Sequence, residues 1–167
     1  MVKLKVKVKK DNKEDFFVET VEDYIEKMSE LRSKRKVFCE ELEIEFLEGE
    51  EIDREVFQAL QVQQHNVEDY LENIERKCFI DKITLILIIK EGGSKTKGWE
   101  ELEECNIEIY EMDSLRDLAI HMVEEGYYGA FSKNLEWYID YNKIACDLAH
   151  DYCEDTILGK NYVYCFY

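Results

Sequence analysis

The sequence predicts an α+β fold with short, mainly antiparallel strands. Two segments alternate apolar and charged residues as half-buried strands do, capped helical patterns lie between strand-like segments, and a turn-centred pair of segments ends the chain. The 167 residues are 46% apolar and 13% aromatic, which is enough for a core and too much for a disordered acidic chain. This length fits one large domain or two to three small ones.

The first elements are expected in the N-terminal fifty residues. Leu4, Val6 and Val8 alternate with lysines, as in a half-buried strand. Thr20, followed three residues later by Asp23, resembles a capping box and predicts a helix through about residue 36. A second alternating strand is expected at 41–47. If the two strands pair, their apolar residues share one face, and Lys3, Lys5 and Lys7 lie opposite Glu41, Glu43 and Glu45.

The middle of the chain predicts two helices, a buried strand and an acidic segment. Helices are expected at 53–64 and 66–77, because each begins at an Asp or Asn that suits a cap. The apolar run Ile83–Ile89 has no alternation and predicts a strand covered on both faces. A glycine-bearing loop follows, then a short acidic helix at 99–105 and a strand at 107–112.

The C-terminal part predicts helices closed by a β-hairpin. Ser114 suits the N-cap of a helix that stops at Gly126, and a second helix is expected at 141–152. The terminal hairpin runs from 156–158 to 162–166. We therefore expect three domains: an N-terminal α+β domain (1–50), an acidic middle α/β domain (51–112) and a C-terminal helical domain with the hairpin (113–167).

Charge limits the partners of the chain. Its net charge is −17 and its pI about 4.6. Residues 1–36 carry 11 basic and 8 acidic side chains, whereas residues 37–167 carry 11 basic and 31 acidic ones. Such a surface repels nucleic acid and anionic membranes, so no direct binding to either is expected. No apolar run approaches the roughly 18–20 residues that span a bilayer, and no signal peptide is recognised, which favours a cytoplasmic protein.

Acidic residues are concentrated in the segments 40–53, 68–75 and 100–111. Helical neighbours at i and i+3 or i+4 lie about 5–6 Å apart. B-DNA has one phosphate per strand every ~3.4 Å of its axis, and a larger spacing through space because the backbone winds. A row such as Glu68, Glu72 and Glu75 would therefore approximate a phosphate track, with few local counterions. The alternative interpretation of each row is an ordinary solvated face.

The candidate partner-binding residues are carboxylates of these segments and of the helix after Ser114. They are Glu48, Glu50, Glu51, Glu68, Asp69, Glu72, Glu75, Glu100, Glu101, Glu103, Glu104, Glu108, Glu111, Asp117, Glu124 and Glu125. Glu124 and Glu125 are expected at the C-terminal end of a helix, where the helix dipole disfavours acids. That placement favours a functional role for both residues.

Chemical motifs are absent or weak. The chain has no P-loop, nucleophile elbow, dinucleotide fingerprint, metalloprotease or EF-hand motif, and a nuclease would need a basic groove, so neither catalytic residues nor cofactors are expected. Cys146, His150 and Cys153 would share one helical face and could bind zinc with a fourth ligand, but an ordinary helix stripe is the simpler interpretation. Most of the six cysteines are expected to be small buried side chains.

Within residues 114–167, a Tyr138-Ile139-Asp140-Tyr141 block is followed by Asp147-Leu148 and a short terminal hairpin, and this order resembles the C-terminal domain of the ArdA-type antirestriction proteins. A helix ending in Glu124-Glu125 leads to a Leu-x-x-Tyr-Ile-Asp-Tyr segment, then to Asp-Leu and a terminal hairpin. The family's Gly-Arg before Asp-Leu is Ala145-Cys146 here. The residues that match the family motif are Leu135, Tyr138, Ile139, Asp140, Tyr141, Asp147 and Leu148. We expect Tyr138 and Tyr141 to pack the domain and Asp140 to cap the following helix.

The resemblance implies an elongated acidic homodimer, carried by phages and other mobile genetic elements, that imitates bent double-stranded DNA. Such a protein occupies the DNA groove of Type I restriction–modification enzymes without catalysing a reaction. Three alternatives remain: a DNA mimic that inhibits a CRISPR effector, an acidic adaptor that keeps the domain, and a hydrolytic enzyme. The aromatic residues at the C-terminus would either bury a subunit contact or complete the core.

Overall fold

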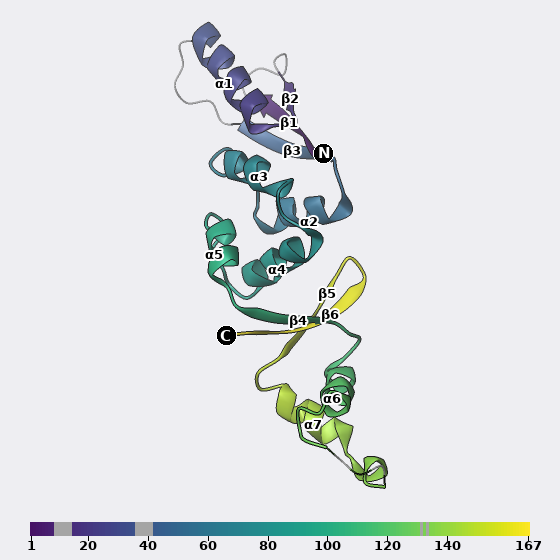
Figure 1. Ribbon diagram of the computed structural model, residues 1–167. Helices are drawn as coiled ribbons and strands as arrows, with labels where there is room; N and C mark the ends of the chain where they lie inside the picture. The colour runs from purple at the N-terminus through teal and green to yellow at the C-terminus, as the bar shows by residue number, and fades with distance from the viewer. Residues whose placement is uncertain (9–14, 36–41, 131, 133) are drawn as a thin grey trace. The chain divides into compact units, whose positions relative to one another are not determined.

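The computed structural model describes residues 1–8, 15–35, 42–130, 132 and 134–167. The chain divides into two compact units, residues 1–104 and 105–167. Each unit contains a three-stranded antiparallel sheet, and the described residues form seven α-helices (Figure 1). The α+β class and the C-terminal hairpin expected from the sequence are confirmed. Among the described helices, none combines the length and the apolar character that a bilayer-spanning segment requires.

The sheet of the first unit has the order β2-β1-β3, with β1 (Lys3–Val8) between β2 (Phe16–Val18) and β3 (Leu42–Glu48). The apolar residues of β1 are at most 1% exposed, and they lie opposite the apolar residues of β3. The two alternating strands and their shared apolar face are therefore confirmed. The short strand β2 was not expected from the sequence.

The lysines of β1 lie opposite acids, as expected, but their ion pairs differ in part. Lys7 faces Glu43 and Lys5 faces Glu45 in the register, whereas a bulge places Lys3 opposite Glu48. The ion pairs formed are Lys3–Glu19 (3.5 Å), Lys5–Asp15 (2.8 Å) and Lys7–Glu45. Glu41, the remaining expected partner, lies outside the described residues.

The first helix, α1 (Val21–Arg35), begins where the capping box predicted. The backbone N–H of Asp23 donates to Oγ1 of Thr20 at 3.1 Å, which satisfies one free N–H of the first turn. Tyr24, Met28 and Leu31 recur at helical spacing and are 2–8% exposed. They form the buried side of α1.

Four helices follow: α2 (Glu51–Ala59), α3 (Val67–Ile74), α4 (Phe79–Lys90) and α5 (Gly98–Glu104). Helix α3 begins after Asn66 as predicted, whereas α2 begins before the expected cap, Asp53. Asp53 instead lies in the first turn of α2, where its Oδ2 accepts from the backbone N–H of Glu50 at 3.1 Å. Its Oδ1 contacts Nζ of Lys82 at 2.6 Å, and both side chains are almost fully buried.

The predicted strand at Ile83–Ile89 is wrong, because this segment is the core of helix α4. Residues 82–89 are all at most 9% exposed. A helix that is covered on every side is hydrophobic all round, so it lacks the polar face that reveals helical periodicity. Asp81 in its first turn accepts from the N–H of Cys78 at 3.1 Å and marks the helix start.

The second unit combines a sheet of order β4-β6-β5 with two helices. The strands are β4 (Ile107–Glu111), β5 (Cys153–Ile157) and β6 (Lys160–Phe166), and the helical segments are α6 (Leu115–Glu124), η1 (Glu136–Tyr138) and α7 (Tyr141–Leu148). Leu158 and Gly159, both at positive φ, form the two-residue turn of the expected hairpin. Strand β4 was assigned to the middle domain, but it pairs with β6, so the second unit begins before β4. The expected division of residues 1–104 at residue 50 stays a prediction.

Helix α6 has both predicted ends. The N–H of Asp117 donates to Oγ of Ser114 at 3.3 Å, which confirms the N-cap. At the other end Gly126 has a φ of +82°. The N–H of Gly126 bonds the carbonyl of Val123, and the N–H of Tyr127 bonds that of Met122, which is the Schellman arrangement that favours glycine.

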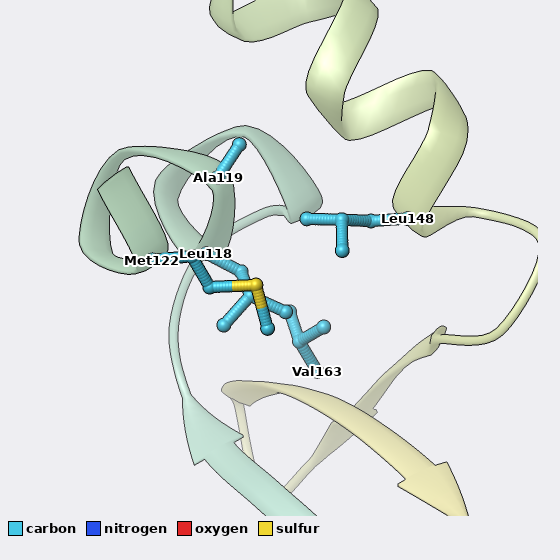
Figure 2. Packing of buried hydrophobic residues seen from close by; sticks show 5 residues of the cluster. All are labelled: Leu118, Ala119, Met122, Leu148 and Val163. Atoms are coloured by element: carbon cyan, nitrogen blue, oxygen red, sulfur yellow. The ribbon is translucent and has the colours of Figure 1, made fainter. Parts of the chain in front are cut away.

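The core of the second unit lies between α6, α7 and β6. Figure 2 shows Leu118, Ala119 and Met122 of α6 gathered with Leu148 of α7 and Val163 of β6. All five side chains are at most 9% exposed. This cluster holds α6 and α7 on one face of the sheet.

Candidate functional site

The acidic residues of α3 lie on its exposed side. Glu68, Asp69 and Glu72 are exposed, whereas the apolar residues between them are buried. This follows from the helical spacing of the apolar residues, which turns one side of α3 toward the core and leaves the acids in solvent. Glu75, the fourth predicted acid of this row, is the residue that ends the helix.

Helix α5 brings a second group of carboxylates to α3. Asp69 of α3 and Glu100 and Glu103 of α5 line one pocket of about 230 Å³. Trp99, 8% exposed, and Lys97 also line it. Acids that are 31 or more residues apart in the sequence therefore face the same depression, an arrangement that the sequence pattern did not predict.

Several predicted acids of these helices have partners inside the chain, so the expectation of few local counterions is only partly right. Glu101 accepts from the backbone N–H of Ser94 at 2.9 Å. The other contacts are Glu72 with Arg76 (3.1 Å), Glu75 with the N–H of Val2 (2.8 Å), and Glu103 with Lys77 (3.1 Å). Exposed pairs of this kind contribute roughly 0–1 kcal/mol to stability, but they reduce the free negative charge.

A smaller set of acids has no ion pair or side-chain hydrogen bond with any described residue. These exposed acids are Glu48, Glu51, Glu68, Asp69, Glu100 and Glu104. Glu50 is the N-cap residue of α2. Burial raises the pKa of Tyr24 to about 12, and the negative charge of Glu68 adds to the shift. The charge of Glu68 on α3 therefore acts on Tyr24 of helix α1.

The two predicted acids of β4 stabilise the fold of the second unit. Glu108 accepts hydrogen bonds from the hydroxyls of Tyr152 at 2.6 Å and Tyr167 at 2.5 Å, and these bonds lower the pKa of Glu108. Both oxygens of Glu111 contact Nζ of Lys160, at 2.7 and 2.9 Å. Carboxylates held in this way are less available to a partner.

The three predicted acids of α6 differ in their surroundings. Asp117 is half-buried and accepts from the hydroxyl of Ser114 at 2.6 Å, so it belongs to the helix cap. Glu124 and Glu125 are exposed at the C-terminal end and have no described partner. They lie where the helix dipole is negative, as expected.

The residues of the family motif have mixed roles. Asp140 caps α7, since its Oδ1 accepts from the N–H of Lys143 at 3.2 Å, which confirms the expected cap. Leu148 belongs to the core, Tyr141 and Ile139 are half-buried, and Asp147 and Leu135 are exposed. Tyr138 is 84% exposed, so the expectation that it packs the domain is wrong.

The candidate zinc ligands do not share a helical face. Helix α7 ends at Leu148, so His150 follows the helix and Cys153 begins β5. Within the described part of the chain, no group of three or more histidine, cysteine or acidic side chains could hold a metal ion. Cys78, Cys146 and Cys153 are exposed and only Cys165 is buried, contrary to the expectation for most cysteines; Cys39 lies outside the described residues.

The C-terminal aromatic residues are divided between the interior and the surface. Tyr162 and Tyr164 of β6 are 2% exposed, whereas Tyr167 is 75% exposed. Several further exposed aromatic side chains lie between α6 and α7 in the sequence: Trp137 is 90%, Tyr138 84% and Tyr127 64% exposed. This exposed group was not expected, although the pair Tyr127-Tyr128 directly after the helix-ending Gly126 was a signal for it.

Comparisons with protein-family models, with curated proteins and with solved structures found no match to this chain.

Proposed function

We propose that this chain is an acidic DNA mimic that inhibits a DNA-binding defence enzyme, in the first place a Type I restriction–modification enzyme, by occupying its DNA groove. It would act in the cytosol of the host cell, as a homodimer, without catalysis and without a cofactor. The motif residues of the second unit that resemble ArdA-type proteins support the class of target. The exposed carboxylates on α3 and α5 that have no partner among the described residues are the observation that carries the mimicry.

Free carboxylates of this kind would bind a cationic groove as DNA phosphates do. Glu68, Asp69, Glu100 and Glu104 form no ion pair with a described cation, although Lys97 lines the same pocket as Asp69 and Glu100. A basic groove gains affinity for DNA mainly from phosphate contacts, and that affinity falls steeply as salt rises. An acidic protein in the same groove would associate rapidly at low salt and weaken in the same direction.

The contacts inside the chain divide the predicted acids into two functional groups. Glu108, Glu111 and Asp117 have partners within the second unit: hydroxyl groups bond Glu108 and Asp117, and Lys160 forms an exposed ion pair with Glu111. We assign these three acids to stability. The free acids of α3 and α5, with Glu124 and Glu125 of α6, are assigned to the partner.

The test is competition between this protein and DNA for a Type I restriction–modification enzyme. Labelled DNA bound to the enzyme should be displaced. The inhibition constant of the protein, calculated with the DNA affinity measured at each salt concentration, should rise when salt is raised from 50 to 200 mM. The double variant Asp69→Asn/Glu100→Gln removes two free charges at one pocket and should weaken displacement about tenfold. The matched control Glu22→Gln/Glu26→Gln removes two exposed charges from α1 and should change it by less than about threefold.

If the two double variants weakened DNA displacement equally, the mimicry would not be localised to α3 and α5. The total charge of the protein would then be the cause of displacement. Displacement of DNA from a CRISPR effector, but not from the restriction enzyme, would keep mimicry and change the target. No displacement from either enzyme at low salt would refute the proposal and favour an acidic adaptor.

A further inference from the structure

The second unit carries exposed aromatic side chains next to an acidic pocket. Trp137 and Tyr138 of η1 are 90% and 84% exposed, and Leu135 before them is 54% exposed. Tyr127 and Tyr128, which follow α6, are 64% and 47% exposed. Single exposed apolar residues are ordinary, but several large ones within one short stretch of sequence favour an interaction site.

The pocket has about 550 Å³ and lies between the end of α6, η1 and the start of α7. Val123 and Ala130 give it apolar walls, and Tyr141 contributes an aromatic ring. Glu124 and Glu136, from two different elements, supply carboxylates. Neither carboxylate has a described partner, and the described residues that line the pocket include no cation. We call it the Glu124/Glu136 pocket.

The local electrostatics favour a cation in this pocket. Two carboxylates face one volume, and the C-terminal end of α6, with its negative dipole, lies beside them. Like charges that share a site repel each other, and a cation between them removes that repulsion. The apolar walls suit an aliphatic stem, since long cationic side chains lay their stem on apolar surface and keep the charged group at polar atoms.

We propose that the Glu124/Glu136 pocket binds an arginine side chain from a segment of a partner protein, and that Trp137 and Tyr138 contact the same segment. A guanidinium group pairs with carboxylates through several N–H donors and stacks on aromatic rings, which an ammonium group does less well. A pocket of this volume accommodates one such side chain with its neighbours.

A second copy of this chain fits this surface less well. In a symmetric dimer the same surface of each copy meets the other, so residues near the axis face their own counterparts. Glu124, Glu125 and Glu136 would then approach the same three acids, at a cost from like charges. The same acids that would repel a second copy attract a basic segment. The inference stands apart from DNA mimicry, because it holds equally for an adaptor protein.

The test uses N-acetyl-arginine amide as the probe and the full chain labelled with ¹⁵N. Titration should shift amide signals of residues 123–141 more than those of α3 and α5, and the shifts should weaken with added salt. The uncharged isostere N-acetyl-citrulline amide should give shifts at least about fivefold weaker, since it keeps the shape and loses the charge. Shifts spread evenly over all acidic segments would overturn the proposal.

Matched variants separate the pocket from the general charge. Glu124→Gln/Glu136→Gln should weaken binding of the probe at least about fivefold. The control Asp113→Asn/Asp151→Asn removes two exposed charges from the same unit outside the pocket and should change binding less than about twofold. Unfolding of each variant in urea shows whether the fold is kept. Equal weakening by both variants would overturn the proposal. Signals of Trp137 and Tyr138 that shift with protein concentration alone would also overturn it, because they would identify a second copy of the chain as the occupant.

Discussion

The buried ion pair between Asp53 of α2 and Lys82 of α4 gives a quantitative prediction about stability. The side chains are 5% and 10% exposed, and Oδ1 lies 2.6 Å from Nζ. Removing one partner of such a pair leaves an uncompensated buried charge, which costs about 3–5 kcal/mol. The change is best made at Lys82, because Asp53 also accepts from the N–H of Glu50. We expect Lys82→Met to lower the free energy of unfolding by about 3–5 kcal/mol at pH 7.

The assay is urea unfolding followed by far-ultraviolet circular dichroism, with the free energy extrapolated to water. Asp53→Asn/Lys82→Met should recover to within about 1–2 kcal/mol of the parent, because no buried charge remains unpaired and the asparagine oxygen still accepts at the start of α2. Lys95→Met, at an exposed loop residue, should change stability by less than about 0.5 kcal/mol. A loss below about 1 kcal/mol for Lys82→Met, or a double variant less stable than Lys82→Met, would refute the reasoning.

Three further predictions concern the second unit. Because hydrogen bonds from Tyr152 and Tyr167 lower the pKa of Glu108, that carboxylate stabilises the fold above its ordinary pKa of 4.5, and this stability is lost as pH falls through the lower folded value. A carboxyl NMR titration of Glu108 should give a pKa below 4.5 that rises in Tyr167→Phe; an unchanged value would contradict it. Gly126→Ala should cost about 1–2 kcal/mol at a φ of +82°, and Gly126→Asn less, in urea unfolding; equal losses would argue against backbone strain. Leu118→Ala should cost about 2–5 kcal/mol in the same assay, whereas the exposed Leu135→Ala should cost under about 0.5 kcal/mol; similar losses would contradict a core between α6, α7 and β6.

Local patterns predicted most of the secondary structure. The alternation in β1 and β3 predicted both their buried face and their pairing, because side chains on a strand alternate between two faces. The caps of α1 and α6 were predicted from Thr20 and Ser114, since N-capping depends on a side chain next to the helix. The C-terminal end of α6 was likewise predicted from one residue, Gly126.

Helix α4 could not be recognised from the same kind of signal. A continuous apolar run fits a buried strand and a buried helix equally, and its isoleucines favour a strand. The deciding interactions are long-range: α4 is surrounded on all sides, and its one buried lysine pairs with an aspartate 29 residues away. Tertiary contacts of this kind override local preference.

The sequence predicted which carboxylates of the candidate site are exposed, but not which of them have partners elsewhere in the chain. The exposed acids of α3 follow from helical spacing, which the sequence contains. The partner of Glu103 is Lys77, 26 residues away, and that of Glu111 is Lys160, 49 residues away. Such neutralising contacts depend on the packing of distant segments, so the sequence overestimated the number of free carboxylates.

The contrasting environments of the two tryptophans provide an optical reporter. Trp99 lies in the first unit and is 8% exposed, whereas Trp137 lies in the second unit and is 90% exposed. The emission of Trp137 is that of a hydrated indole in the native state, so unfolding barely changes its wavelength. A red shift on denaturation therefore arises from Trp99. Intrinsic fluorescence would follow the melting of the first unit alone, without any label.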